Sequence, residues 1–548
     1  MVQLSRRQVL YAAGAATVVS LTGCGDDDGP DKKDLDRNRA GAMEKYGVGD
    51  QFRAAEPVTF SILYNNHPNY PLKPEWLFWS ELAKRTNVKL DPVAVPLSDY
   101  EQKRSVLVSS GDAPLIIPKT YHPQENSYVS SGAILPVSDY LDLMPHFKEK
   151  LEKWNLKPEM DTLRQEDGKF YLLPGLHEKP WQEYTLAVRT DVLEQLGIPS
   201  PTTWDEVYAM LKAMRAAHPD VHPFSDRFGK PNPAGNLLNM LALSHGLPGA
   251  GWNYQATAWD AGAGKYVFTG ASEQYRQVVT FLHKLVAEGL LDPETFTQTD
   301  DQARQKLASG KSFVISTNAQ TLVNDYRPDI AKINPNARLK KIMFPIGPAG
   351  PVNPASRLEN GVMISSKARD GKHFVAMMQF IDWLWYSDAG QEFAKWGVEG
   401  TTYTRDASGR RAPTADVDIV GLNPKGTKHL QKDFGFANGV FAYGGKLDLV
   451  QSFFSPEEME FQREMNGRKP APWVTPPPAP LTDSEREQTT LWATALKDYV
   501  TQNTLKFALG QRPLSEWDAY VTELKGKNAQ AYTDLVNKAY ERYRKNHG

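Results

Sequence analysis

Few side chains in the chain have types and spacings that match a catalytic or metal-binding motif. The tripeptide Gly310-Lys311-Ser312 resembles the end of a phosphate-binding loop, but Gln305 stands where the first glycine belongs. His177-Glu178 lacks the second histidine of a zinc helix, and Pro180 would break such a helix. Carboxylates are numerous enough for a glycosidase pair, but no spacing singles one out. We therefore expect binding rather than catalysis.

The only cysteine, Cys24, follows a segment with the anatomy of an export signal. An uncharged apolar run over residues 9–21 precedes it, and an acid-rich stretch, residues 25–36, comes after. Residues 21–24, Leu-Thr-Gly-Cys, resemble the lipobox of bacterial lipoproteins, whose cysteine thiol is diacylated and becomes the first residue of the mature chain. Residues 5–10, Ser-Arg-Arg-Gln-Val-Leu, resemble a twin-arginine export motif. We expect Cys24 to anchor the protein at the extracytoplasmic face of the cell membrane.

Composition narrows the class of protein further. The 548 residues carry a formal net charge of −2, which gives no reason to expect nucleic acid as a partner. Hydrophobic residues at 41% and charged residues at 23% are ordinary for a soluble globular protein. A chain this long exceeds one compact core, so two or more lobes are expected. A single cysteine allows no internal disulfide and no thiolate metal site, and we expect no metal, no cofactor and a monomer.

Strands and helices are predicted to alternate in the first part of the chain, and they would position any site there. Strands are predicted at residues 58–64, 88–95 and 113–117, with helices at 74–84 and 98–111 between them. This order predicts a parallel sheet with right-handed crossovers. In an open sheet of this kind, ligands lie at the carboxyl ends of the strands.

Capping boxes mark two later helices. Thr203-x-x-Glu206 opens a helix that continues to about residue 217, and Thr482-x-x-Glu485 opens the C-terminal helical region. A further helix is expected near residues 236–244.

Several stretches stand in a characteristic order and spacing. They are residues 110–117, 132–140, 167–171, 189–197 with 201–204, 380–385 with 396–400, and 539–543. In this order they resemble the solute-binding lipoproteins of bacterial ABC importers, the extracellular solute-binding family 1, and in particular its long sugar- and oligosaccharide-capturing members. The resemblance covers most of residues 57–548. It implies an α/β, two-lobed periplasmic-binding-protein-like fold of type II, with hinge strands and a central ligand cleft.

These signals together predict the division of the chain. Residues 1–23 form a lipoprotein signal peptide, and residues 24–56 form a lipidated cysteine with a flexible tether, because Asp, Lys, Gly and Pro dominate there. Lobe 1 takes residues 57–178 and about 357–400. Lobe 2 takes residues 179–356 and about 401–548, including the C-terminal helical region.

A sugar ring offers an apolar CH face and a rim of hydroxyl groups. A binding cleft therefore needs aromatic platforms and side chains that donate and accept hydrogen bonds. Loops after the predicted strands and near the expected crossings supply such side chains, and the resemblance places the last three in cleft-facing loops. The candidate ligand-binding residues are Tyr64, Asn65, Asn66, Lys119, Tyr121, Trp181, Glu183, Trp252, Asn318, Gln320, Glu359, Trp396 and Glu399. A tryptophan is more often core than platform, and the asparagines could instead satisfy turn backbone.

The resemblance implies capture without chemistry. Two lobes close over a sugar or oligosaccharide, and the loaded protein docks on the transmembrane subunits of an ABC permease. Some long family members carry a calcium loop, but residues 218–223 lack the run of Asp and Asn ligands, so no calcium is expected. The alternatives are a surface-anchored glycan-degrading enzyme and an adhesion or cell-wall lipoprotein that imports nothing.

Overall fold

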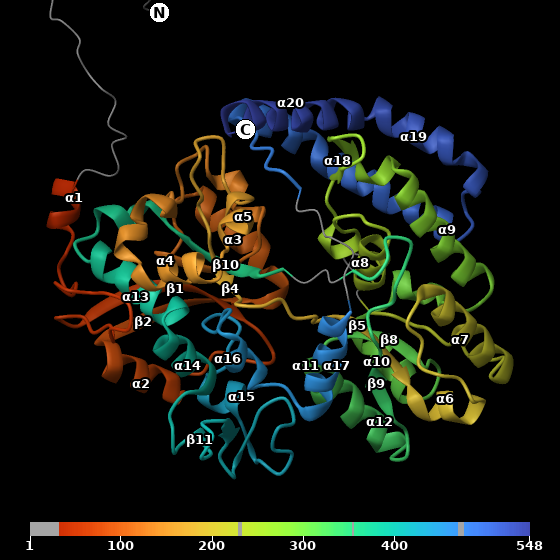
Figure 1. Ribbon diagram of the computed structural model, residues 1–548, viewed down its shortest axis with the longest axis horizontal. Helices are drawn as coiled ribbons and strands as arrows, with labels where there is room; N and C mark the ends of the chain where they lie inside the picture. The colour runs from red at the N-terminus through yellow and green to blue at the C-terminus, as the bar shows by residue number, and fades with distance from the viewer. Residues whose placement is uncertain (1–31, 228, 230–232, 353–355, 469–475, 548) are drawn as a thin grey trace, which may run out of the picture.

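The computed structural model describes residues 32–547, except 228, 230–232, 353–355 and 469–475. Two lobes stand side by side in Figure 1, with the red and orange N-terminal part on one lobe and the blue C-terminal helices on the other. The predicted α/β, two-lobed fold is confirmed. Within the described residues, no helix is both long and apolar enough to span a membrane. Cys24 and the predicted signal peptide lie outside the described residues.

Lobe 1 is built on a five-stranded sheet of order β2-β1-β3-β10-β4. Its strands are β1 (Val58–Asn66), β2 (Val88–Pro96), β3 (Ile116–Thr120), β4 (Leu173–Leu176) and β10 (Leu358–Ile364). β1 pairs in parallel with β2 and β3 through helices α2 (Leu77–Thr86) and α3 (Tyr100–Ser109), which confirms the predicted alternation. β10 runs antiparallel between β3 and β4. The carboxyl ends of β3 and β4 therefore meet the amino end of β10 at one edge of the sheet.

Two helices, α13 (Phe374–Tyr386) and α14 (Asp388–Trp396), pack in the core of lobe 1. Every residue of α13 is buried, because the helix is apolar and aromatic nearly all round. Phe78 of α2 stacks on Phe393 of α14 and on Phe441, at ring-centroid distances of 5.5 and 4.5 Å. The other elements of this lobe are α4 (Pro145–Lys153), α5 (Lys157–Asp161), β11 (Tyr403–Arg405), β12 (Arg411–Pro413), β13 (Val417–Asp418), β14 (Lys428–His429), α15 (Leu430–Phe434) and α16 (Leu447–Gln451).

The segment after α1 (Lys32–Arg37), residues 38–56, is packed onto lobe 1, whereas the sequence predicts a flexible tether there. The Phe52 side chain is fully buried, 6.2 Å from Phe380 between ring centroids. The Tyr46 hydroxyl donates to Asp382 at 3.1 Å. The tether prediction is wrong for these residues, because a few apolar side chains dock a segment whose average composition is that of a linker.

Residues 401–451 also belong to lobe 1, although the sequence assigns everything after about residue 400 to lobe 2. Val417, Phe436 and Tyr443 are buried in the same core as the lobe 1 sheet. Most of this segment is irregular, so its aromatic residues have no periodicity that would tell which core they complete. The chain joins lobe 2 only at α17 (Pro456–Gly467), which packs in the second large core.

Lobe 2 contains an antiparallel sheet of order β8-β5-β9, made of β5 (Thr185–Arg189), β8 (Val314–Thr317) and β9 (Leu339–Lys341). Helix α7 (Trp204–Ala217) begins at the predicted capping box, where the Glu206 amide donates to Thr203 Oγ1 at 3.1 Å. The other elements of this part are α6 (Thr190–Leu196), α8 (Gly235–Ser244), β6 (Thr257–Asp260), β7 (Lys265–Phe268), α9 (Glu273–Ala287), α10 (Asp300–Ala308), α11 (Ala319–Thr321) and α12 (Arg327–Ile333).

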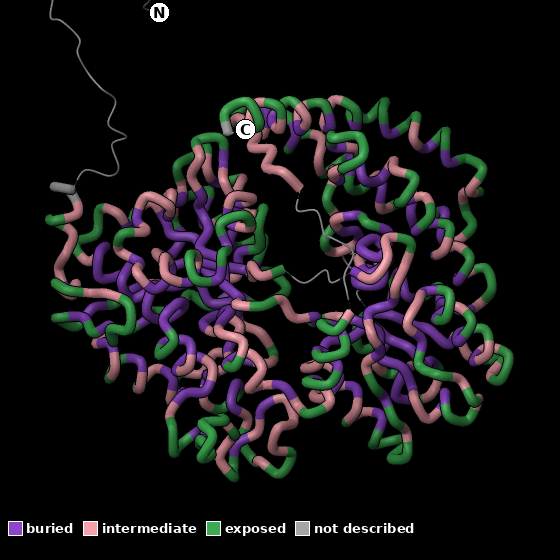
Figure 2. Tube along the Cα trace, viewed as in Figure 1, coloured by how far each residue is buried: buried purple, intermediate pink, exposed green. Residues whose placement is uncertain are grey.

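Three C-terminal helices extend lobe 2: α18 (Asp483–Ala508), α19 (Trp517–Gly526) and α20 (Ala529–His547). α18 starts at the second predicted capping box, formed by Thr482 and Glu485. Val500 and Phe507 of α18 are buried in the lobe 2 core. In Figure 1, α18 and α20 lie at the top of the molecule and extend toward the lobe that carries α3 and α5. Burial in Figure 2 shows a separate purple interior in each lobe.

The connections between the lobes include residues 177–184, 342–352, 356–358 and 452–458. At the lobe 1 end, the His177 amide donates to the Arg357 carbonyl at 2.9 Å. At the lobe 2 end, Gln462 of α17 holds the backbone of Gln182. The Gln182 amide donates to Gln462 Oε1 at 2.9 Å, and Gln462 Nε2 donates to the Gln182 carbonyl at 2.6 Å. These segments are called the hinge below.

Candidate ligand-binding cleft

A cavity of about 290 Å³ lies beside the hinge, between the two lobes. Lobe 1 contributes β10, lobe 2 contributes α8 and the loop at Trp252, and the first crossing segment runs along it. The lining residues are His177, Trp181, Gln182, Glu183, Tyr184, Asn236, Asn239, Met240, Leu243, Trp252, Phe344, Ser356, Leu358 and Glu359. Of the predicted ligand-binding residues, the cavity thus brings together Trp181, Glu183, Trp252 and Glu359.

A larger groove of about 380 Å³ lies within lobe 2, between α17 and β9. Its lining comes from lobe 2 and from the adjoining ends of the crossing segments, and much of its polar surface is already paired, as in the Lys341–Glu458 ion pair at 3.0 Å. Of these two cavities, the interlobe cavity is the one that β10 of lobe 1 also lines, so its contacts change when the lobes move relative to each other. We therefore take the interlobe cavity as the functional site.

Aromatic rings form one part of the cavity wall. The Trp252 ring meets the Tyr184 ring edge to face at 4.9 Å between centroids. The Trp181 ring lies 5.5 Å from Phe454, so it is held between the first crossing segment and the third. Rings fixed in this way offer apolar faces on which the CH side of a sugar ring can stack. Trp181 and Trp252, two of the predicted aromatic platforms, therefore line the cavity, and their contact with a sugar stays a prediction.

Glu359, near the start of β10, is a strongly anchored carboxylate. Its Oε2 lies 3.1 Å from His177 Nε2 and accepts from the Gly444 amide at 2.9 Å. Burial opposes ionisation, but the His177 contact, the nearby Lys395 charge and the Gly444 amide together lower the pKa of Glu359 to about 2. The cavity therefore contains a carboxylate that is ionised at neutral pH.

Glu183 approaches the cavity from the end of the first crossing segment. Asn318 Nδ2 donates to Glu183 Oε1 at 3.3 Å, while Asn318 Oδ1 accepts from the Thr321 amide at 2.8 Å and caps α11. Solvent reaches the Glu183 side chain, but the surrounding protein and the Glu359 carboxylate raise the pKa of Glu183. The two cavity carboxylates therefore have pKa values shifted in opposite directions. Asn318 itself supports Glu183 from outside the cavity lining.

Two lining residues that sequence reasoning missed are Asn236 and Asn239 of α8. The Asn236 side chain is fully buried, and neither Oδ1 nor Nδ2 has a hydrogen-bond partner among the described residues. An unsatisfied buried amide costs about 1–3 kcal/mol, so a ligand hydroxyl in the cavity would stabilise it. The sequence did contain a signal for these residues: two asparagines stand three residues apart in a helix whose other residues are mostly apolar. That spacing puts both amides on one face of the helix.

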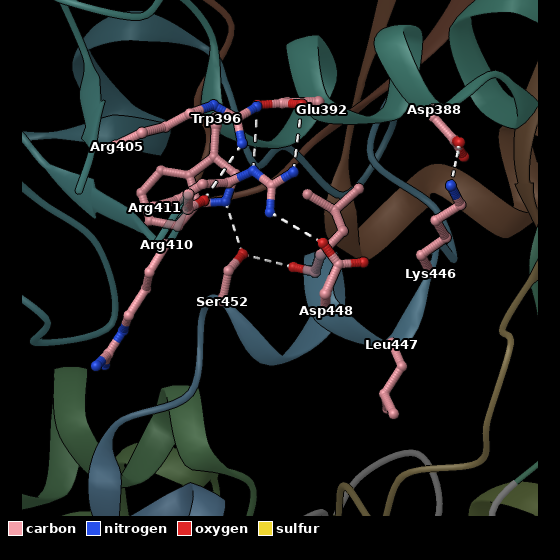
Figure 3. Close-up of polar contacts among 12 residues, drawn as sticks. Asp388, Glu392, Trp396, Arg405, Arg410, Arg411, Lys446, Leu447, Asp448 and Ser452 are labelled. Atoms are coloured by element: carbon pink, nitrogen blue, oxygen red, sulfur yellow. Dashed lines mark hydrogen bonds and ion pairs between the residues drawn. The ribbon is translucent and has the colours of Figure 1, made fainter. Parts of the chain in front are cut away.

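Tyr64 and Trp396 are core residues rather than ligand contacts. Tyr64 is fully buried; its hydroxyl donates to the Tyr70 carbonyl at 2.7 Å and accepts from Asn438. Trp396 is fully buried, and its Nε1 donates to Ser452 Oγ at 2.8 Å, as Figure 3 shows. Both rings complete the aromatic interior of lobe 1, whose packing depends on residues far away in sequence. The two predictions are wrong for that reason.

Glu399 lies away from the cavity, next to the hairpin of β11 and β12. Its Oε2 is 3.4 Å from Arg405 Nε, and Arg405 also pairs with Glu392. Figure 3 shows Arg405 and Arg411 converging on Glu392. Glu399 therefore belongs to an ion-pair network of lobe 1, and its predicted contact with a ligand is wrong.

Asn65 and Asn66 at the end of β1 are outside the cavity lining. Asn66 Oδ1 accepts from the Leu72 amide at 2.9 Å, so this side chain stabilises the turn after the strand. Asn65 is 3% exposed. Both residues were predicted to contact the ligand, but in this conformation neither of them lines the cavity.

Lys119, Tyr121 and Gln320 also lie outside the lining. The Lys119 ammonium is 5.9 Å from the centroid of the Tyr121 ring, and Tyr121 is 48% exposed beyond the end of β3. Gln320 Nε2 in lobe 2 donates to Gln431 Oε1 in lobe 1 at 3.4 Å. Gln320 therefore spans the lobes as a direct contact, whereas a ligand contact was predicted.

Two α/β lobes joined by crossing segments, with a cavity lined from both sides, define a two-lobed binding protein. Residues 77–396 match the family of bacterial extracellular solute-binding proteins, and the chain belongs to this family. The predicted resemblance is confirmed.

Known proteins extend the likeness over nearly the whole chain. The chain is 23% identical to FusA, a fructooligosaccharide ABC transporter substrate-binding protein of Streptococcus pneumoniae, over 99% of this chain and 98% of that protein. It is 25% identical to the polygalacturonan/rhamnogalacturonan-binding protein YtcQ of Bacillus subtilis over 48% of this chain and 50% of YtcQ. The solved structure of alginate-binding protein AlgQ2 without calcium ion superposes with a TM-score of 0.69, 20% identity, 90% coverage of this chain and 99% of that chain.

Proposed function

We propose that the protein is the lipid-anchored solute-binding component of an ABC importer and captures a sugar or oligosaccharide between its lobes. The observation that carries the proposal is the interlobe cavity, which combines tryptophan faces with unsatisfied amides and carboxylates. The sugar-related names of its relatives agree with this chemistry. Trp181 and Trp252 stack on the ring, and Glu183, Glu359 and Asn236 bind its hydroxyls.

Ligand binding favours the closed form, because only that form contacts the ligand from both lobes. The loaded, monomeric protein then docks on the transmembrane subunits of a permease and releases the sugar there. Its own side chains form and break no covalent bond in the ligand. The lipid on Cys24 keeps the protein at the extracytoplasmic face of the membrane.

One observation supports the alternative of a glycan-degrading enzyme. Glu183 and Glu359 face the same cavity with pKa values displaced in opposite directions, as in the acid and base pair of a glycoside hydrolase. Against it, both of the hydrogen-bond contacts to Glu359 Oε2 come from lobe 1 itself, which suits a structural acceptor.

Thermal shift and calorimetry of the full chain against a panel of oligosaccharides test capture, with chromatography of the same samples to detect products. A rise in melting temperature with unchanged sugar supports capture. Cleavage of a glycan that is lost in Glu183→Gln would contradict the proposal and favour the enzyme. Membrane fractionation of Cys24→Ala tests the anchor, and a variant that stays fully membrane-bound counts against it.

A further inference from the structure

The charge of the captured sugar is a property that the relatives leave open. Their names include a neutral fructooligosaccharide in one case and the acidic polygalacturonan in another. An inference about charge rests on the proposed sugar capture, and it must come from the side chains of this cavity.

The lining of the interlobe cavity carries negative charge without a cation of its own. Among the described lining residues, Glu183 and Glu359 are carboxylates and no lysine or arginine occurs. Glu359 is ionised at neutral pH, since its pKa is lowered to about 2. A ligand carboxylate placed in this cavity would lie close to a fixed negative charge in a partly desolvated space, where repulsion is poorly screened.

Two buried or partly buried cations near the cavity, Lys341 and Lys395, are outside the lining and engaged elsewhere. Lys341 is 3% exposed at its side chain, pairs with Glu458 at 3.0 Å and donates to the Glu183 carbonyl at 3.2 Å. Lys395 donates to the Ala442 carbonyl at 3.2 Å. Recruiting either of them to a ligand would leave a buried acceptor or carboxylate without its partner, which is costly.

Two further cations are placed against aromatic rings. The Arg227 guanidinium lies 6.0 Å from the centroid of the Tyr184 ring, on the side of lobe 2, and Arg227 is 8% exposed. Lys119 stands at the sheet edge of lobe 1 beside Tyr121, and its charge acts on both Glu183 and Glu359. Lys119 is only partly buried and therefore accessible to a ligand, so the experiment below includes it.

Neutral hydrogen-bonding capacity is present in the lining as well. Within the described part of the chain, Asn236 has an unused donor and an unused acceptor, Gln182 Oε1 has no partner, and His177 Nδ1 has none. All three residues are buried and line the cavity. Hydroxyl groups both donate and accept, so they satisfy such a mixed set, whereas a carboxylate only accepts.

We propose that the interlobe cavity selects a neutral sugar chain and rejects uronic-acid chains, with Glu183 and Glu359 as the residues that determine this specificity. The carboxylates accept hydrogen bonds from sugar hydroxyls and repel a sugar carboxylate. The amides of Asn236 and Gln182 complete the contacts to the hydroxyl rim.

Calorimetry of the full chain with sugars of matched length tests the selection. The neutral probes are nystose, maltotetraose, xylotetraose and mannotetraose, and the acidic probes are tetragalacturonate and tetramannuronate. At least one neutral probe should bind at least tenfold more tightly than either acidic probe. Residual binding of the acidic probes should strengthen as salt screens the repulsion.

Charge-neutralising variants assign the effect to residues. Glu183→Gln and Glu359→Gln, singly and together, should raise the affinity for tetragalacturonate at least tenfold in the double variant. Glu399→Gln is the control. It removes a carboxylate that lies in lobe 1, like Glu359, but outside the cavity, so it should leave the affinity for every probe unchanged. Circular dichroism and melting temperature of each variant show that it is folded.

Different failures have different meanings. Binding of tetragalacturonate as tight as that of the best neutral probe would overturn the charge selection while supporting sugar capture. Uronate binding that disappears in Lys119→Met would overturn it and identify the responsible cation. Binding of neither class would count against the proposed function itself.

Discussion

Two of the places where the lobes are joined differ in their chemistry. At the lobe 2 end of the hinge, Lys341 of β9 and Glu458 of α17 form an ion pair with side chains only 3% and 6% exposed, and Gln462 binds the backbone of the first crossing segment. At the second place, called the far contact, α18 and α20 reach lobe 1. There Arg486 Nη1 donates to Gln165 Oε1 at 2.7 Å, and Arg542 lies 3.8 Å from Glu166.

The difference shows which contact is suited to persist and which to break. A buried ion pair is costly to disrupt, because a lone charge would stay in a desolvated site. A more exposed pair contributes less, because water replaces each partner. The far contact is mixed: the Arg542 and Glu166 side chains are 28% and 46% exposed, whereas the Arg486 side chain is 12% exposed and Gln165 is 6% exposed. The hinge therefore has the properties of a fixed pivot, and the far contact, which is partly exposed, is the more reversible of the two. The predictions below test this assignment, from the largest expected effect to the smallest.

Glu458→Ala should disrupt the pivot. Removing the carboxylate leaves the Lys341 ammonium buried without its partner, so the free energy of unfolding should fall by about 3–5 kcal/mol. Urea denaturation followed by circular dichroism measures it. Glu460→Ala, on the same helix but paired only with exposed Arg463, is the control and should be nearly neutral. A loss below about 1 kcal/mol in Glu458→Ala would contradict the buried-pivot assignment.

Acid should weaken the ion pairs between α18 and α20, the two helices that form the far contact. Arg542, the Thr482 amide and Lys538 lower the pKa of Glu485 to about 2, although burial opposes them. Because folding lowers this pKa, the ionised form is stabilised in the folded state. That stability, about 3 kcal/mol by linkage, is complete above about pH 4.5 and lost as pH falls through about 2.

The measurement for this carboxylate is unfolding free energy against pH for wild type and Glu485→Gln. The wild-type curve should drop more steeply below about pH 4.5, because the variant has no group to protonate at this position. Parallel curves would exclude Glu485 as the source of the acid sensitivity.

Arg486→Ala should open the far contact without unfolding the protein. The variant loses charge-assisted hydrogen bonds to Gln165 and to the Asn126 carbonyl, which are worth about 1–2 kcal/mol. Small-angle scattering of the ligand-free protein should show a larger radius of gyration, and sugar affinity should fall about three- to tenfold. Arg463→Ala serves as a matched surface control. An unchanged radius together with unchanged affinity would show that this contact does not hold the lobes together.

Glu166→Gln should have the smallest effect. The Glu166 side chain is 46% exposed and 3.8 Å from Arg542, so its loss should cost less than about 1 kcal/mol. Differential scanning calorimetry at low and high salt measures this, and the small effect should vanish at high salt. A cost above about 2 kcal/mol would make the far contact a second fixed joint and erase the contrast with the hinge.

Local signals in the sequence were enough for much of the fold. The alternation of strands and helices in the first part of lobe 1 and the capping boxes at Thr203 and Thr482 depend on neighbours within a few residues, and the structure contains them. The segment around residues 401–451 was misassigned, because the choice between two cores is made by contacts with residues far away in sequence.

The candidate site divides in the same way. Trp181 and Glu183 stand next to a chain crossing that sequence reasoning approximately located, Trp252 lies in a glycine-flanked loop, and the family resemblance pointed to Glu359; all four line the cavity. Trp396 was predicted to contact the ligand for similar reasons, but its ring stacks on the Phe453 ring inside lobe 1, at 4.5 Å between centroids. Burial of this kind is a property of the assembled core rather than of the local sequence.

The packing of residues 38–56 on lobe 1 has a mechanical consequence for an anchored protein. With a lipid on Cys24, the attachment would reach the folded protein at lobe 1, through a connection that includes the short helix α1. Lobe 2, joined to lobe 1 through the hinge, the Gln320–Gln431 contact and the far contact, would then make most of the movement. Lobe 1 would keep its orientation relative to the membrane, because it is the attached lobe, and lobe 2 would move relative to it.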